Sequence, residues 1–388
     1  MTDTRTATRS ALLAAVEAQR DVLAASNDAD EQLGTLSPAS LAALVASGVL
    51  GMKLPQVLGG CEADLVTQME VLERLAMINP AVAWCAMVGA TSLAMAGAFL
   101  PAAGVARMFA DGDIPRGAIV VTPTGVATAT TGGYRLNGRW GFASGVRHAQ
   151  WMVAVARVER SDHGSPDLHF LVLPVAQCEI LDNWQVLGLK GTGSCDIVIK
   201  DVFVPAEMTF AVTDPPRRGG ALYRLGLPAF VAYEHAGFAL GIARRVLDDL
   251  VTLVQHKRRG YGPAGNSIAE RGSLQGLIGH AEMRLRAARA LVVETNEQAW
   301  AVVSAGQVLS AEQQCTLRSA ASYATDVSVE LVATAFRNAG AGAIYASHAM
   351  QRCLRDINVA AQHYMVADTA YEQLGRARLG YTDINPMA

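Results

Sequence analysis

Apolar residues recur every three or four positions through the first hundred residues, and this spacing predicts helices. The clearest run, ALLAAVEAQRDVLAAS, begins at Ala11. Ser37 followed by Pro38 predicts the start of another helix, because serine caps helix N-termini and proline suits the first helical position. A loop containing Gly59-Gly60 then separates this region from a further helix that we expect to begin near Leu65.

Residues 75–106 contain no charged side chain. A segment of this length could cross a bilayer. However, Asn79-Pro80 and Pro101 interrupt the segment, and it contains more Ala, Gly, Ser and Thr than Leu, Ile or Phe. Proline breaks helices, and small residues give little membrane affinity. We therefore expect a buried pair of helices and no membrane span.

Between Ile114 and Val212 the pattern changes to short runs rich in Val, Thr, Ile and aromatic residues, such as GAIVVTP and LHFLVLP. Gly, Pro, Asn and Asp separate these runs, which predicts antiparallel β-structure. From Leu222 onward the helical spacing returns over four long segments, and these can bury their apolar faces as a four-helix bundle. The four segments lie near 223–257, 268–304, 310–338 and 346–375.

This order predicts an N-terminal helical domain over 1–113, a middle β domain over 114–215 and a C-terminal helical bundle over 216–388. A chain of 388 residues is long enough for such a division and for a large core. A net charge of -3 gives no field to attract nucleic acid, so we expect no nucleic-acid partner. Six scattered cysteines without a CxxC pair, and histidines without an HExxH pattern, favour a cytoplasmic protein without a metal site.

Near the C-terminus, Arg355-Asp356 is followed seven residues later by His363. This stretch resembles the acyl-CoA dehydrogenase superfamily, whose dehydrogenases place a catalytic Glu shortly after an Arg-Asp pair. The Glu would fall near Tyr364, and here Gln362-His363 precede that position. A Gln-His pair is similar to the flavin-dependent monooxygenase branch, the oxygenase components of two-component (group D) hydroxylases. The alternative is a histidine packed at a helix seam.

The resemblance covers nearly the whole chain from about residue 20 and implies the acyl-CoA dehydrogenase-like fold. It also implies a homotetramer and a cofactor of reduced flavin, FMN or FAD, supplied by a separate flavin reductase. Oxygen would add at flavin C4a, and the resulting hydroperoxide would hydroxylate or oxygenate an aromatic or heteroatom-bearing small molecule. His363 would then be a catalytic group that exchanges a proton or donates a hydrogen bond.

Phe142 and Ser144 match the positions that lie beside the isoalloxazine ring in this family. An aromatic side chain supplies a flat wall, and a hydroxyl two residues later on a strand points to the same side, where it can bind flavin N5. Ser144 would therefore be both a catalytic and a cofactor-binding residue. The alternative is an ordinary hairpin with an inward Phe and a serine that stabilises the turn.

Three further segments resemble cofactor-binding parts of the family. The loop LGLKGTGSCD matches a Gly-rich turn and offers Gly191, Thr192 and Gly193, although it has no phosphate-loop or dinucleotide motif. Arg258, followed by Tyr261, matches an arginine that holds the flavin pyrophosphate. The turn with Asn338 and Gly340 departs from the family's Gln and Gly content, which leaves FMN and FAD both open; an ordinary turn beside a solvated arginine is the alternative.

The substrate pocket is expected to include Trp84, Thr91, Ser92 and Tyr364. Many relatives in the monooxygenase branch carry a His a few residues after an Ala-Trp pair, whereas this chain has Thr91-Ser92 there. Trp84 is equally suited to a core position. Two other functions remain open: an acyl-CoA dehydrogenase or oxidase that uses Glu234 as its base, and a non-catalytic helical binding protein.

Overall fold

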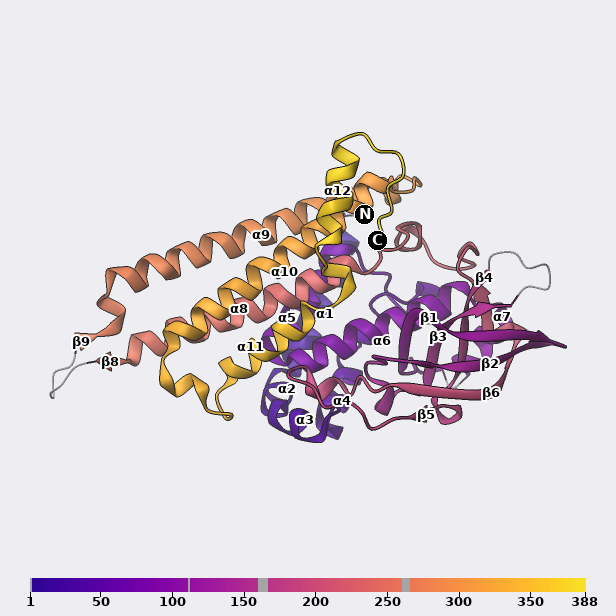
Figure 1. The fold of residues 1–388 in the computed structure, drawn as a ribbon, viewed down its shortest axis with the longest axis horizontal. Coiled ribbons are helices and arrows are strands. Elements are labelled where there is room, and N and C mark those ends of the chain that lie inside the picture. Colours follow the sequence, from indigo (N-terminus) through magenta and orange to yellow (C-terminus); the bar gives the residue numbers. More distant parts are fainter. Residues whose placement is uncertain (1, 111, 160–166, 260–265) are drawn as a thin grey trace. The chain divides into compact units, whose positions relative to one another are not determined.

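Seven strands in the middle of the chain form a sheet, and helices precede and follow it in the sequence (Figure 1). The structure, a computed structural model, describes residues 2–110, 112–159, 167–259 and 266–388. The chain divides into two units, the sheet unit and the bundle unit. The sheet unit comprises Met1–Ala63, Trp84–Val186 and Lys190–Tyr223, and the bundle unit comprises Asp64–Ala83, Leu187–Leu189 and Arg224–Ala388. The three-domain division stays a prediction.

Four helices open the sheet unit, and the predicted cap at Ser37 is confirmed. The Ser37 hydroxyl accepts a hydrogen bond from Ser40 N at 3.3 Å, at the start of the fourth helix. Buried Asp30 strengthens this start by accepting from Ser37 N and Ser40 Oγ, both at 2.7 Å. The helices are α1 (Thr2–Ala18), α2 (Arg20–Ala25), α3 (Asn27–Leu33) and α4 (Pro38–Ala46).

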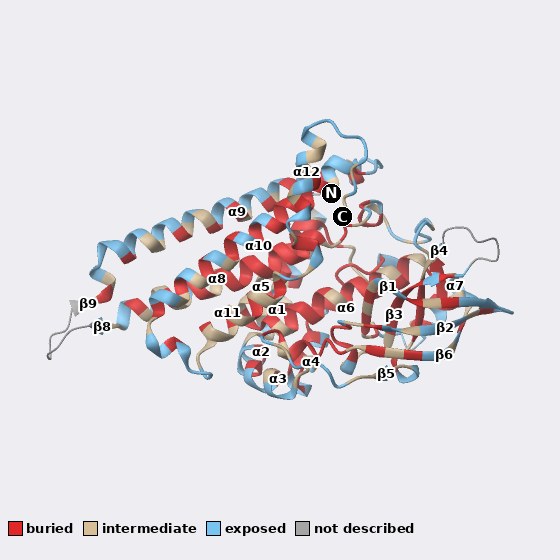
Figure 2. Ribbon diagram, in the orientation of Figure 1, coloured by how far each residue is buried: buried red, intermediate tan, exposed pale blue. Residues whose placement is uncertain are grey.

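The uncharged segment forms parts of three helices, α5 (Leu65–Ile78), α6 (Pro80–Phe99) and α7 (Ala102–Met108). Asp64 caps α5 at Thr67 N, which confirms the predicted start at Leu65. By length and composition α6 could cross a membrane, but 83% of its most apolar window is buried in the protein (Figure 2). Because core helices of soluble proteins have the same composition, α6 is weak evidence for a membrane span.

The seven-stranded sheet has the order β5-β6-β2-β1-β3-β4-β7. Its pairs are antiparallel except β1–β3, so the antiparallel prediction is wrong for this pair. The chain leaves β2 at Trp140 and crosses the end of β1 to enter β3 at Trp151, opposite Gly117. Therefore β3 runs against β2 and parallel to β1. The strands are β1 (Gly117–Thr130), β2 (Gly133–Trp140), β3 (Trp151–Val158), β4 (Asp167–Pro174), β5 (Glu179–Ile180), β6 (Ile197–Pro205) and β7 (Thr209–Ala211).

Long helices dominate the bundle unit, and three of them overlap the predicted segments, although the first begins at Ala232 and not near 223. The fourth predicted helix, over 346–375, is wrong as a single helix, because the chain breaks it between Ala360 and Thr369. His363 lies in this break. The elements are α8 (Ala232–His256), β8 (Arg258–Arg259), β9 (Asn266–Ser267), α9 (Gly272–Ser304), α10 (Ala311–Ala339), α11 (Ala349–Ala360) and α12 (Thr369–Arg378).

Two glycines explain how closely α8 packs against α5 within the bundle unit. A Cβ atom at Gly237 would lie 2.4 Å from the carbonyl oxygen of Met69, and one at Gly241 would lie 2.2 Å from that of Glu73. These glycines are four residues apart, so they lie on the same face of α8. Any side chain at either position would push the two helices apart. α8 also packs against α10, which packs in turn against α9.

Candidate functional site

Four side chains in the sheet unit form a buried chain of hydrogen bonds around Ser144. Trp84 Nε1 donates to Ser144 Oγ at 3.0 Å, and Ser144 Oγ lies 2.7 Å from Ser194 Oγ. Thr192 Oγ1 lies 2.7 Å from Ser194 Oγ in turn. All four residues are at most 8% exposed. The structure thus joins the predicted pocket residue Trp84 to the predicted cofactor residues Ser144 and Thr192.

The donors and acceptors of this cluster determine where the Ser144 proton can point. A serine oxygen has two lone pairs and one proton, and the indole nitrogen of Trp84 can only donate. When Thr192 donates to Ser194 and Ser194 donates to Ser144, both lone pairs of Ser144 are filled. In that arrangement the Ser144 proton is available to a further acceptor. The cluster can therefore present a hydrogen-bond donor at Ser144.

The backbone at Phe142 and Ser144 differs from the strand that the sequence predicts. β2 ends at Trp140, and Ser144 N donates to Phe142 O at 2.9 Å across a tight turn. Phe142 has a φ of 62°, in the left-handed region that a bulky residue rarely adopts. The expectation of two side chains on one face of a strand is wrong: Ser144 is buried, whereas Phe142 is 75% exposed.

Exposed Phe142 and half-buried Trp184 form an aromatic pair in the sheet unit. Their ring centroids lie 6.2 Å apart and their planes are perpendicular. An exposed aromatic side chain on a strained backbone contributes little to folding, and such strain is typical of functional sites. The pair supplies an apolar wall of the kind that a fused aromatic ring needs. These residues therefore fit a flavin.

The Gly-rich loop lies directly against the Ser144 turn. Gly145 N donates to Thr192 O at 2.8 Å, and Ala143 N donates to Cys195 O at 3.1 Å. Gly191 is buried. Gly193 has a φ of 53°, which glycine adopts without strain and which makes the tight turn before Ser194 possible. A Cβ at Gly193 would lie 2.9 Å from Gly34 O. The loop therefore supports Ser144, and its predicted direct contacts with flavin stay a prediction.

The predicted pocket residues Thr91 and Ser92 are both buried on α6. Lys53 Nζ, which is itself fully buried, donates to Thr91 Oγ1 at 3.0 Å. Ser92 packs against the strand β1, since a Cβ at Gly117 would lie only 2.0 Å from its hydroxyl oxygen. Their contact with a substrate stays a prediction.

In the bundle unit, His363 is held in one orientation. Its Nδ1 accepts a hydrogen bond from Met365 N at 3.3 Å, so the neutral ring carries its proton on Nε2. The ring stacks on His235 of α8 with centroids 4.3 Å apart, and it lies 4.9 Å from the ring of Tyr364. Burial, aided by the positive charge of Arg318, lowers the pKa of His363 to about 4. His363 is therefore a neutral donor through Nε2 at neutral pH.

The Arg355-Asp356 pair that stands out in the sequence holds the start of the Gly-rich loop. Leu189 N donates to buried Asp356 at 2.6 Å, and Arg355 Nη1 donates to Leu187 O at 2.8 Å. A Cβ at Gly188 would lie 2.4 Å from the carbonyl group of Arg355. The pair is therefore structural in this chain.

The segments that contain Arg258 and Asn338 meet through a residue that the sequence analysis missed. Lys257 Nζ donates to Ala339 O at 2.6 Å, and a Cβ at Gly340 would lie 2.5 Å from the same ammonium. Gly340 has a φ of 82°, while Asn338 donates to Thr334 O within its own helix. Arg258 is exposed on β8, and Tyr261 lies outside the described residues.

Lys257 also lines a shallow hollow at the end of α8, with a volume of about 650 Å³. Its cationic and imidazole groups suit an anion such as a phosphate. The hollow is lined by Arg245, Asp249, Thr252, Leu253, His256, Lys257, Ser347, His348 and Ala349.

Glu234, the alternative dehydrogenase base, is fully buried in the first turn of α8. It directly precedes His235, which stacks on His363. The two competing catalytic hypotheses therefore concern neighbouring parts of the same unit. Sequence patterns alone did not reveal His235 as a site residue, because it belongs to no recognisable spacing.

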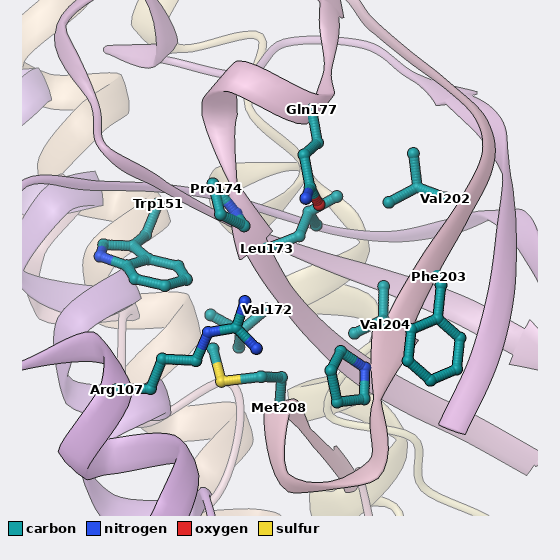
Figure 3. A pocket seen from close by; sticks show the side chains of 11 residues that line it. Arg107, Trp151, Val172, Leu173, Pro174, Gln177, Val202, Phe203, Val204 and Met208 are labelled. Carbon is teal, nitrogen blue, oxygen red and sulfur yellow. The ribbon is translucent and has the colours of Figure 1, made fainter. Parts of the chain in front are cut away.

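A second cavity in the sheet unit, with a volume of about 310 Å³, contains none of the predicted site residues (Figure 3). Its walls are mostly apolar, and Arg107 of α7 extends among them. It is lined by Arg107, Trp151, Val172, Leu173, Pro174, Gln177, Val202, Phe203, Val204, Pro205 and Met208.

Comparison with known proteins adds independent evidence. Residues 233–368 match the family model for the acyl-CoA dehydrogenase C-terminal domain. The chain is 30% identical to indole-3-acetate monooxygenase of Pseudomonas putida, over 87% of this chain and 86% of that protein. It is 31% identical to the oxygenase component of the FADH2-dependent resorcinol hydroxylase of Rhizobium sp., over 66% of this chain and 67% of that protein.

The fold is also shared with solved structures. XiaF from Streptomyces sp., solved with FADH2 and glycerol, superposes with a TM-score of 0.91 at 24% identity and covers 99% of both chains. This likeness confirms the predicted acyl-CoA dehydrogenase-like fold. Together with the two sequence relatives, it leads to one assignment: the chain belongs to the flavin-dependent monooxygenases with the acyl-CoA dehydrogenase fold.

Proposed function

We propose that this chain is the oxygenase component of a two-component system that uses reduced flavin and O2 to oxygenate an aromatic small molecule. The observation that carries the proposal is the buried chain Thr192–Ser194–Ser144, which can present one proton at Ser144 beside an exposed aromatic wall at Phe142. The bound reduced flavin supplies the electrons that activate O2. The residues of the chain bind and orient it.

The proposed role of Ser144 is to hold flavin N5 by a hydrogen bond. Because Trp84 fills one lone pair of the Ser144 oxygen, the indole group orients the hydroxyl. Phe142 and Trp184 provide the apolar wall for the ring. Lys257 and Arg258 are the groups that suit the phosphates, with Gly340 allowing the close approach.

The proposed role of His363 is to donate a hydrogen bond from Nε2 to the reacting atoms. A pKa of about 4 keeps the ring neutral at physiological pH, which favours donation over proton exchange. Stacking on His235 and the bond from Met365 N hold the ring in place. Preorganised donors of this kind stabilise charge that develops during a reaction.

The names of the relatives support an aromatic substrate, since one acts on indole-3-acetate and another on resorcinol. The term oxygenase component in the second name supports a separate flavin reductase as partner. We further propose a cytoplasmic homotetramer, in line with the family resemblance. Trp84, Thr91, Ser92 and Tyr364 remain the proposed substrate contacts.

Rapid mixing tests this function. Protein with reduced FMN or FAD, prepared without oxygen, is mixed with O2 while the flavin absorbance is followed. We expect bound flavin to return to the oxidised state in separate phases and much more slowly than free flavin. Reoxidation at the rate of free flavin with both cofactors would contradict the proposal. Addition of a reductase, NADH and aromatic acids or phenols then tests for an oxygenated product.

A further inference from the structure

Arg318 of α10 is a buried arginine whose side chain donates hydrogen bonds to two parts of the chain, the segment after His363 and the last residues of the sequence. Its side chain is 1% exposed. Nε donates to Met365 O at 3.2 Å, and Nη2 donates to Tyr364 O at 2.6 Å and to Thr369 Oγ1 at 3.2 Å. Nη1 donates to Pro386 O at 2.9 Å and to Ala388 O.

The arrangement uses the full capacity of a guanidinium group. Arginine has five N–H donors in a fixed plane, and five oxygen acceptors surround Arg318. Burial of a charge without such partners is costly. Three of these acceptors lie in Tyr364, Met365 and Thr369, where the chain has left the path of the predicted helix. The bonds of Arg318 therefore stabilise the break around His363.

The same bonds connect Arg318 to the imidazole of His363. Arg318 Nη2 binds the carbonyl of Tyr364, and the same planar peptide group carries the N–H of Met365 that donates to His363 Nδ1. That bond places the proton of the neutral ring on Nε2. Ser319 adds a further tie by donating to Ala370 O at 3.0 Å.

We propose that Arg318 is a positioning residue that sets the orientation and tautomer of His363 through the Tyr364–Met365 peptide group. This inference rests on the proposed role of His363 as a donor to the reacting atoms. Arg318 itself does not contact the reacting atoms. Its role is to keep the loop at His363, Tyr364 and Met365 in one conformation, so that Nε2–H always faces the same way.

Nuclear magnetic resonance of protein labelled with 15N-histidine tests the orientation without any flavin. The His363 signals are assigned by their loss in His363→Asn, and their shifts distinguish the two neutral tautomers. We expect the Nε2-protonated form alone in the unsubstituted protein and a mixture of both forms in Arg318→Met. Arg318→Lys keeps a charge and three donors, so it should restore most of the Nε2 form.

Two further variants keep the test decisive. Thr369→Val removes one acceptor and leaves the guanidinium in place, so it reports on the same loop if Arg318→Met fails to fold. Arg289→Met is the control, because Arg289 is a half-buried arginine of the same unit that pairs with Glu70 and Glu73 and not with the loop at His363. It should lower stability and leave the His363 tautomer unchanged.

A double-mutant comparison links the positioning to the reaction. We expect Arg318→Met to lower product formation by about 10-fold or more, as misplaced reacting groups do. In the His363→Ala background the same substitution should cause no further loss, because both act through one group. Full activity of His363→Ala would remove the proposed role of His363. An unchanged tautomer in Arg318→Met, or a full additional loss in the double variant, would remove the role of Arg318 alone.

Discussion

Trp84 and Ser144 are sixty residues apart in the sequence, yet the indole nitrogen of Trp84 donates a 3.0 Å hydrogen bond to the Ser144 hydroxyl. Trp84 begins the part of α6 that belongs to the sheet unit, whereas Ser144 lies in the turn after β2. The bond fixes which lone pair of Ser144 is occupied. Since the indole nitrogen can only donate, the serine proton is offered away from Trp84.

Replacement of Trp84 by phenylalanine tests this relationship. Trp84→Phe keeps an aromatic ring and removes the N–H, so the Ser144 hydroxyl can rotate. We expect more H2O2 released per NADH consumed and a loss of unfolding free energy of about 1 kcal/mol. Trp140→Phe is the matched control: it removes the buried bond from Trp140 Nε1 to Val155 O and should reduce stability only. Equal effects on coupling in both variants would contradict the assignment.

Ser144→Ala and Ser194→Ala distinguish the proposed hydrogen-bond donor, Ser144, from the hydroxyl that orients it, Ser194. Ser144→Ala removes the proposed bond to flavin N5 and should release most of the NADH electrons as H2O2 while the protein stays folded. Ser194→Ala leaves the donor in place and removes the hydroxyl that fills its second lone pair, so it should uncouple less. Peroxide and product are measured per NADH. If Ser144→Ala stays fully coupled, the donor lies elsewhere.

Phe142→Gly tests whether the strained, exposed aromatic residue is kept for a ligand. Glycine accepts the positive φ without strain, so the protein without flavin should gain about 0.5–1 kcal/mol of stability or lose none. The affinity for reduced flavin should fall, because the apolar wall is lost. Urea unfolding and flavin titration measure the two effects. A stable variant that binds flavin normally would show that Phe142 is no part of the cofactor site.

The sequence predicts the helix–sheet–helix order, the cap at Ser37, the helix start near Leu65 and the identity of Ser144 and His363 as candidates. These features depend on local spacing and on motifs. The parallel β1–β3 pair and the break at His363 escape prediction, because each depends on partners distant in the chain. Arg318 looks like any helical arginine until the structure places Tyr364 and Met365 around it. The hydrogen bond between Trp84 and Ser144 could not be predicted either, because no sequence pattern links the two residues.

Stability should fall as the pH is lowered below neutrality. Burial, with the charges of Arg318 and Arg116 respectively, lowers the pKa of His363 and of His148 to about 4. Below pH 6.5 the unfolded chain takes up protons at these positions and the folded chain does not, so folding becomes less favourable. Each histidine should cost about 1 kcal/mol by pH 5.5. Urea unfolding at pH 7.5, 6.5 and 5.5 measures this slope.

His363→Asn should make that slope shallower, because asparagine does not titrate. A slope identical to that of the unsubstituted protein would show that His363 is not held neutral by the fold. The comparison does not go below pH 5.5, so that most carboxyl groups remain ionised in both states.

The last prediction decides between oxygenation and acyl-CoA dehydrogenation. If His363 donates to the reacting atoms, His363→Ala should lower product formation about 100-fold, the usual scale for a positioned acid, base or donor. His363→Asn retains a neutral N–H donor and should keep more activity than alanine. Glu234→Gln preserves the shape of the buried carboxyl group at the start of α8 and should change oxygenation little.

The dehydrogenase hypothesis requires the opposite order, because a carboxylate base would be lost in Glu234→Gln. It also requires that acyl-CoA bleach the oxidised flavin bound to the protein. Both variants are therefore measured in both assays, with stability followed by urea unfolding. His363→Ala should lose less than the roughly 2 kcal/mol expected of a core truncation, since His363 is only partly buried. An inactive Glu234→Gln beside an active His363→Ala would overturn the oxygenase mechanism, because the donor that His363 supplies would then be dispensable.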